Sequence, residues 1–89
     1  VMSTIPTWRA NLTDALNERG DAGPVIHYAP NEAAFDIEFD CGFGGTKGPD
    51  VLAWTETRVY FPVVYDGAEW MESAPRNPQA EGQAHVGGQ

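Results

Sequence analysis

The sequence has few cysteines and few basic residues, and it contains no long hydrophobic run. The single cysteine, Cys41, excludes an intramolecular disulfide and a zinc site built from several cysteines. Five residues of 89 are Lys or Arg, spread along the chain, and this scarcity argues against direct binding of nucleic acid. No signal-peptide pattern and no run of about 20 apolar residues occurs, so we expect a cytoplasmic protein that does not bind membranes. Val1 precedes Met2, and we expect Met2 to be the natural start.

The negative charge is the most informative feature that is present. The formal net charge is −8, and the excess lies in the middle of the chain. Residues 32–50 carry five carboxylates against Lys47, and residues 51–74 carry four against Arg58. A field of one sign repels nucleic acid and anionic membranes, and it attracts basic protein surfaces at long range. The charge therefore predicts a basic partner.

Length and composition predict one small domain followed by a tail. The chain has 89 residues, below the roughly 100–200 that are usual for a domain, yet ten are aromatic and can form a core. We expect residues 1–74 to form the domain. Residues 75–89 contain little apolar content and are expected to be a flexible, disordered tail.

Residues 7–19 have the pattern of an amphipathic helix. Trp8, Leu12 and Leu16 recur at a spacing of four residues and would form one apolar stripe. Thr7 is suited to the N-cap position, and Gly20 is suited to end the helix.

The remaining regular segments have strand patterns. We expect short strands at 25–29 and 51–55, and a hairpin in which 57–65 and 68–73 flank Asp66-Gly67, a pair that favours a type I′ turn. Pro62 cannot donate to a strand ladder, so it should lie on an edge or at a bulge. The predicted fold class is α+β, with the helix packed on an antiparallel sheet of three to four strands. The other face of the sheet would be wet and acidic.

Residues 31–40 are compatible with two structures. Asn31 could cap a short helix, and a helix would bring Phe35 and Phe39 to one face. The strict alternation of apolar and acidic residues from Phe35 to Asp40 favours a half-buried strand instead, and we predict a strand.

On a strand, Asp36, Glu38 and Asp40 would form a row of carboxylates about 6.6–6.8 Å apart. Such a row can imitate backbone phosphates and occupy a cationic groove, because these grooves derive much of their affinity from charge neutralisation. The alternative is that the row is only the solvated side of an amphipathic strand. The predicted partner-binding residues are all acidic: Asp36, Glu38, Asp40, Asp50, Glu56, Glu69 and Glu72.

Three patterns typical of enzymes and metal proteins are incomplete in this sequence. An EF-hand loop starting at Asp36 would need Gly and Glu where Cys41 and Lys47 stand. The glycine-rich segment 42–48 lacks the Gly-Lys-Ser/Thr order of a phosphate-binding loop. Cys41 and His27 have no local signature of a nucleophile and its base. We therefore expect no enzymatic activity, no metal and no cofactor.

Three segments resemble a known group of proteins. They are Ile-Pro-Thr-Trp-Arg-Ala at 5–10, Glu-Phe-Asp-Cys-Gly-Phe-Gly-Gly at 38–45, and Arg-Val-Tyr-Phe-Pro-Val-Val-Tyr-Asp-Gly at 58–67. Together they resemble small acidic proteins of bacteriophages and mobile elements, including anti-CRISPR inhibitors of type I systems. The resemblance spans roughly residues 5–78 and contains no diagnostic motif, so no residue role is carried over from it.

The resemblance implies a stoichiometric inhibitor in the bacterial host cell, which blocks target DNA binding by a type I Cascade complex through an acidic, DNA-mimicking surface. The partner would be a basic nucleic-acid-binding surface, for example a Cascade subunit, and the inhibitor would be a monomer or a homodimer. An immunity protein or antitoxin that neutralises a basic nuclease toxin is the alternative, since it relies on the same electrostatic attraction.

Overall fold

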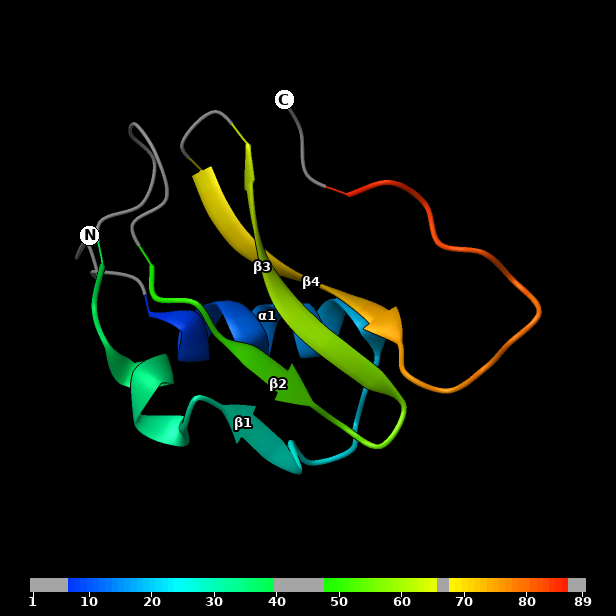
Figure 1. The fold of residues 1–89 in the computed structure, drawn as a ribbon, viewed down its shortest axis with the longest axis horizontal. Coiled ribbons are helices and arrows are strands. Elements are labelled where there is room, and N and C mark those ends of the chain that lie inside the picture. The colour runs from blue at the N-terminus through cyan, green and yellow to red at the C-terminus, as the bar shows by residue number, and fades with distance from the viewer. Residues whose placement is uncertain (1–6, 40–47, 66–67, 87–89) are drawn as a thin grey trace.

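The computed structural model of the chain describes residues 7–39, 48–65 and 68–86. The elements follow in the order α1 (Trp8–Arg19), β1 (His27–Ala29), the 3₁₀ helix η1 (Glu32–Asp36), β2 (Leu52–Trp54), β3 (Arg58–Tyr65) and β4 (Ala68–Pro75). The strands form one antiparallel sheet in the order β1-β2-β3-β4, and α1 lies across one side of it (Figure 1). The predicted α+β class, with one helix on a small antiparallel sheet, is confirmed.

Helix α1 begins and ends at the predicted residues. Thr7 has extended backbone angles, and its side chain accepts a hydrogen bond from the Ala10 N–H, which satisfies one of the free donors of the first turn. At the other end Gly20 adopts the left-handed conformation, with φ of 66°. The N–H groups of Gly20 and Asp21 donate to the carbonyls of Asn17 and Leu16, the pattern of a Schellman motif.

The hairpin is also confirmed in its strands. Tyr65 pairs with Ala68, and the register continues to the pair Arg58 and Pro75 at the far end. The predicted turn type falls on Asp66 and Gly67, outside the described residues. Among the described residues β2 pairs with β3 only through Val59 and Tyr60, so Pro62 lies on a stretch of β3 bordered by β4 alone. Its missing N–H therefore disrupts no ladder on the β2 side, as the edge prediction required.

The strand predicted within residues 31–40 is wrong for residues 31–39, the part of this segment that the structure describes. Residues 32–36 form η1, whose N-cap Asn31 accepts a hydrogen bond from the Ala34 N–H at 3.0 Å. Phe35 and Phe39 are both buried, whereas Ile37 is 51% exposed. The buried aromatic side chains are thus Phe35 inside η1 and Phe39 beyond it, while Ile37 between them is exposed, so the core does not follow the two-residue alternation of the sequence.

The core lies between α1 and the sheet side that faces it, which we call the inner face. Trp8, Phe35 and Tyr60 are fully buried there, together with Leu12 of α1 and Met71 of β4. The Trp8 indole N–H donates to the Pro49 carbonyl at 2.8 Å, and the Trp8 ring lies 4.7 Å from that of Phe39. One side chain therefore joins the helix to two segments that follow η1.

The chain beyond β4 is tied to the loop that joins β2 and β3. Arg76 donates from its backbone N–H to the Thr57 carbonyl and from its side chain to the Thr55 carbonyl. The Asn77 side chain donates to the Glu56 carbonyl at 3.2 Å. Residues 78–86 are exposed and contain no helix or strand. The predicted flexibility of the tail stays a prediction, but its first residues belong structurally to the sheet.

Replacing Gly48 with alanine should destabilise the fold. A Cβ at this position would lie 2.7 Å from three atoms of the Trp8 indole, so the fully buried ring would have to shift. Overpacking of this kind costs about 1–3 kcal/mol. Urea unfolding of Gly48→Ala should show that loss, whereas Gly82→Ala, where nothing lies within 4 Å of the new Cβ, should unfold like the wild type. Equal stabilities of the two variants would contradict the close contact between Gly48 and Trp8.

Candidate protein-binding site

The predicted row of carboxylates does not form as expected. Asp36 is the last residue of η1, and Glu38 lies beyond it, exposed and outside any strand. Asp40 lies outside the described residues. Because no strand carries Asp36 and Glu38, the regular spacing that was to imitate successive phosphates is absent from this part of the chain.

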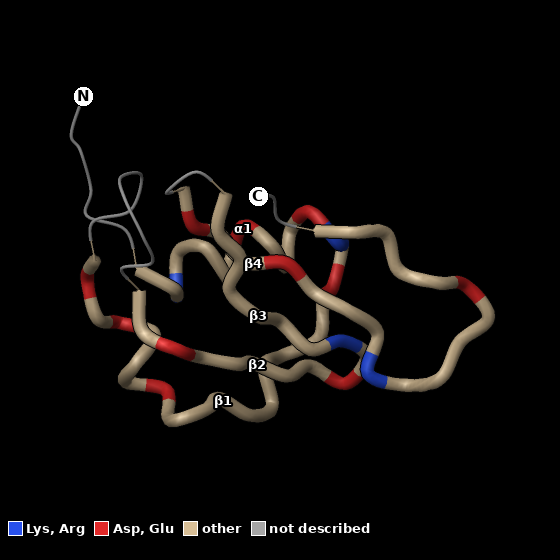
Figure 2. Tube along the Cα trace, turned by 45° about the horizontal axis from the view of Figure 1, so that its top comes forward, with Lys and Arg blue, Asp and Glu red and all other residues tan. Residues whose placement is uncertain are grey.

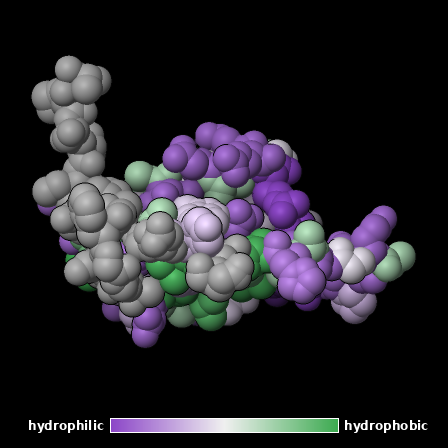
Figure 3. Space-filling view, turned by 90° about the horizontal axis from the view of Figure 1, so that it is seen from above, coloured by the Kyte–Doolittle hydropathy of each residue, from purple (hydrophilic) through white to green (hydrophobic). Residues whose placement is uncertain are grey.

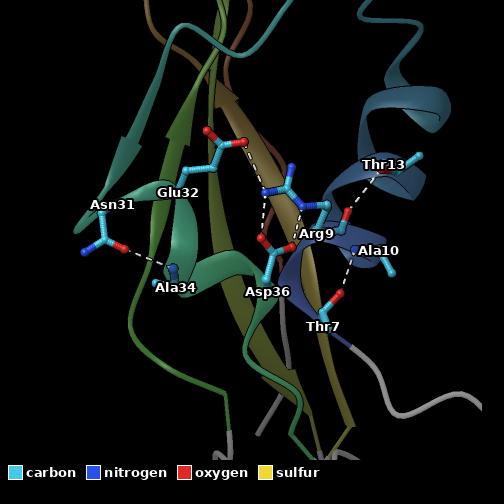
Figure 4. A network of polar contacts seen from close by, with 8 residues as sticks. All are labelled: Thr7, Arg9, Ala10, Thr13, Asn31, Glu32, Ala34 and Asp36. Carbon is cyan, nitrogen blue, oxygen red and sulfur yellow. Dashed lines mark hydrogen bonds and ion pairs between the residues drawn. The ribbon is translucent and has the colours of Figure 1, made fainter.

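Asp36 is engaged within the molecule (Figure 4). Both of its carboxylate oxygens accept hydrogen bonds from Arg9 of α1, and Glu32 accepts a third at 3.1 Å. The hydrogen bonds from the Arg9 guanidinium hold the pKa of Asp36 below its usual 3.8, and those to Asp36 and Glu32 raise the pKa of Arg9 despite some desolvation. The Arg9 guanidinium also lies 6.0 Å from the centre of the Tyr28 ring. These contacts fasten η1 to α1, so Asp36 serves the fold.

The other predicted acidic residues lie on different elements. In Figure 2 the Asp and Glu positions are scattered over the described part of the trace and form no single stripe. Glu69 is 7% exposed, and one of its oxygens accepts a hydrogen bond from the Gly48 N–H. Glu72, three residues along β4, points to the opposite side of the sheet and accepts a hydrogen bond from the Trp70 indole N–H. Among the described residues of the predicted set, Glu38, Asp50 and Glu56 are exposed besides Asp36.

The side of the sheet that faces away from α1 is open to solvent, as predicted, but it is apolar, which corrects the prediction that it is acidic. Alternation along the strands, with the pairing register, places one set of side chains on this side. We call it the outer face. Its members are His27, Ala29, Leu52, Trp54, Val59, Phe61, Val63, Tyr65, Ala68, Trp70, Glu72 and Ala74. Glu72 is the one carboxylate among these described strand residues.

The outer face is accessible to solvent over much of its area. Leu52 is 37% exposed and Tyr65 is 50% exposed, and the other large side chains of the face are half-buried against one another, apart from the exposed His27. The His27 and Trp54 rings pack at 5.2 Å. Viewed from above, the helix side of the domain is largely hydrophilic, and hydrophobic side chains gather on the sheet side (Figure 3). Tryptophan and tyrosine are the side chains most enriched where proteins bind one another strongly.

A second group of polar contacts, which no sequence pattern indicated, centres on Asp21. Its Oδ2 accepts hydrogen bonds from the Thr55 hydroxyl at 2.7 Å and the Tyr60 hydroxyl at 2.9 Å, and its Oδ1 accepts one from the Gly23 N–H. Burial alone would raise the pKa of Asp21, but these hydrogen bonds outweigh it and the pKa lies below 3.8. Burial, together with the nearby Asp21, raises the pKa of Tyr60 to about 12.

This cluster ties the segment after α1 to Thr55, the residue that follows β2, and to β3. It keeps Asp21 ionised and Tyr60 protonated at neutral pH, and this arrangement suits a structural tie. A general base needs a pKa near the working pH, and neither group has one. The Asp21 cluster is therefore assigned to the fold.

Comparisons with protein-family models, with curated proteins and with solved structures find no match to this chain. Among residues 7–39, 48–65 and 68–86, no group of three or more His, Cys, Asp or Glu side chains could hold a metal ion. No helix in the described part of the chain is long and apolar enough to span a bilayer. The features that point to function are the net charge of −8 and the outer face of the sheet.

We expect Asp36→Asn to weaken the acid dependence of stability. The folded-state pKa of Asp36 is below 3.8, so its contribution is present above that value and is lost as pH falls through the folded-state pKa. The variant should be less stable than the wild type at pH 7, and the difference should shrink as pH falls below about 4. Thermal unfolding at several pH values measures this. Glu38→Gln, which alters an exposed carboxylate two residues away, is the control, and the same pH profile in both variants would argue against the Arg9 contact.

Tyr60→Phe tests the Asp21 cluster at the other end of the pH scale. The Tyr60 pKa is about 12 in the fold against 10.0 ordinarily, so its stabilising contribution is present below pH 10 and is lost as pH rises towards 12. Removing a hydrogen bond to a charged group should cost about 1.5–3 kcal/mol at neutral pH. Urea unfolding should show that the difference in free energy of unfolding between wild type and variant becomes smaller above pH 10. Tyr65→Phe, on the outer face, should leave the profile unchanged.

Proposed function

We propose that the protein is a non-enzymatic, stoichiometric inhibitor that covers the basic, nucleic-acid-binding surface of another protein. The charge carries this proposal: the net value is −8, with five Lys and Arg residues against thirteen Asp and Glu. A domain of this charge is repelled by nucleic acid and is drawn to the proteins that bind nucleic acid. The effector that we propose is a type I Cascade complex, whose binding of target DNA would be blocked.

The internal contacts of the basic residues support the proposal. Arg9 is neutralised by Asp36 and Glu32, while Arg58 donates to the hydroxyl and the carbonyl of Ser73. Arg76 donates to the Thr55 carbonyl. The Arg9 charge is offset by its ion pairs, whereas Arg58 and Arg76 keep their charge in contacts with neutral groups. With thirteen Asp and Glu against five Lys and Arg, carboxylates still dominate the potential that a partner meets.

Inhibition follows from occupancy. A cationic groove gains affinity when its Lys and Arg side chains are neutralised, whether phosphates or carboxylates neutralise them. The exposed carboxylates of Glu38, Asp50 and Glu56 are held by a folded chain and would take part of this role. A partner covered in this way could not bind DNA at the same surface, and the effect would require one inhibitor per site.

We expect the protein to co-elute with purified type I Cascade on size exclusion and to reduce its binding of target DNA, with weaker competition at higher salt. Charge reversal of Glu38, Asp50 and Glu56 to Lys should slow association by about tenfold or more, because carboxylates steer the encounter. The matched control reverses Asp14, Glu18 and Glu81, which are also exposed and lie on α1 and beyond β4.

The outcomes separate the possible modes of action. Equal slowing by both triple variants would mean that total charge, and no particular carboxylate, directs binding. Co-elution without loss of DNA binding would mean that the protein acts at a later step, such as nuclease recruitment. Absence of co-elution would argue against Cascade and for a basic nuclease toxin as the partner, as expected of an immunity protein.

A further inference from the structure

The outer face is a contiguous apolar surface that is accessible to solvent, which is unusual for a domain that has no partner. Single exposed apolar residues are ordinary, but a contiguous patch usually marks an interaction site. Here the strand register places apolar side chains of β2, β3 and β4 next to one another. Trp54 lies opposite Val59, and Trp70 lies opposite Val63. Both tryptophans and Phe61 are half-buried, which keeps one side of each available for contact.

None of the described segments covers the outer face. Helix α1 lies on the opposite side of the sheet (Figure 1). Trp8 and Leu12 of α1 belong there to the same buried cluster as Tyr60 and Met71 of the sheet. The chain after β4 turns away at the end of the sheet, since Arg76 and Asn77 bind the β2–β3 loop. In Figure 1 residues 78–86 run beside the sheet and do not cross its strands.

Charge decides between a second copy and a different protein as the occupant. Two chains of −8 each repel one another, and pairing their outer faces would bring Glu72 and its copy into one desolvated interface. Asp50 and Glu56, both exposed, stand just before and just after β2. An apolar centre flanked by carboxylates complements a partner surface whose apolar centre is flanked by Lys and Arg.

We propose that the outer face is the docking surface of the protein, and that its occupant is a basic protein with an apolar centre. The class of this partner rests on the function proposed above, whereas the location of the contact rests on the sheet. Trp54, Phe61 and Trp70 are the anchors, and the carboxylates around them direct the approach and set the orientation. Binding energy comes mainly from the aromatic side chains, and association rate comes mainly from the charge.

The test uses two double variants that change the charge by the same amount. Leu52→Arg with Tyr65→Arg alters the two most exposed large apolar side chains of the outer face. Ala10→Arg with Asn17→Arg alters two exposed positions of α1. With purified type I Cascade as the probe, the outer-face variant should bind at least about tenfold more weakly than the helix variant, because a few side chains near the centre of an interface carry most of its binding energy.

A measurement without mutation accompanies the variants. Trp8 is fully buried, so acrylamide quenching of tryptophan fluorescence in the free chain reports mainly on Trp54 and Trp70. The protein can also be labelled with fluorotryptophan and observed in the complex by fluorine NMR. The signals of Trp54 and Trp70 should then be protected from broadening by a soluble paramagnetic agent. If the double variant fails to fold, this measurement still tests whether the outer face contacts the partner. The single Tyr65→Arg variant, at a position that is 50% exposed, provides the same test.

The outcomes distinguish this inference from the proposed function. Equal binding by both double variants, or two unprotected rings in the complex, would overturn the docking surface and leave the proposed function intact. If the wild type does not bind Cascade, the probe becomes the heparin-retained, nuclease-treated fraction of a bacterial extract. A protein captured there, then identified and purified, should again discriminate between the variants, and failure to capture any protein would overturn the inference.

Self-association is the remaining outcome. Light scattering of the full chain should give a monomer at both low and high salt. A dimer that the outer-face variant abolishes would mean that the face binds a second copy, and it would overturn the assignment to a basic partner.

Discussion

Burial of the Trp8 indole is the constraint on which the rest of the structure depends. The ring is fully buried, contacts Phe39, and donates its N–H to the Pro49 carbonyl. Helix α1 is thereby joined to the segments on either side of residues 40–47. Close approach of the backbone at Gly48 is possible because that residue has no side chain. The Arg9 contacts with Glu32 and Asp36 act from the neighbouring helical position, so two consecutive residues fix where η1 lies.

The elements that could be predicted from sequence are those specified by adjacent residues. Thr7 and Gly20 define the ends of α1 through hydrogen bonds within a few residues, and the hairpin follows from strand-forming residues on both sides of Asp66-Gly67. The segment 35–39 could not be predicted in this way, because its residues satisfy a period of two and a spacing of four equally well. The choice depends on Arg9, which is 27 positions away from Asp36 in sequence. Tertiary contacts overrode the local pattern here.

Of the candidate site, the sequence predicted the net negative charge, and it predicted neither the arrangement of the carboxylates nor the apolar outer face. A net value of −8 is a property of composition and needs no structure, but the arrangement of carboxylates depends on which strands form and which side each residue faces. Glu69 and Glu72 illustrate this, since one supports the Gly48 backbone and the other lies among aromatic rings. The outer face was missed because β3 is apolar on both sides, with Val59, Phe61 and Val63 alternating with Tyr60, Pro62 and Val64. A strand of this kind gives no indication from sequence of which side is covered.

The contacts of Arg76 and Asn77 have a consequence for where the folding unit ends. Composition places the boundary at residue 74, but β4 continues to Pro75 and the next two residues close the loop between β2 and β3. A chain shortened to residue 74 would leave the carbonyls of Thr55, Glu56 and Thr57 without these donors. Cooperative unfolding of the sheet therefore includes residues that look in the sequence like the start of a linker. Any fusion or proteolytic fragment should retain the chain through Asn77.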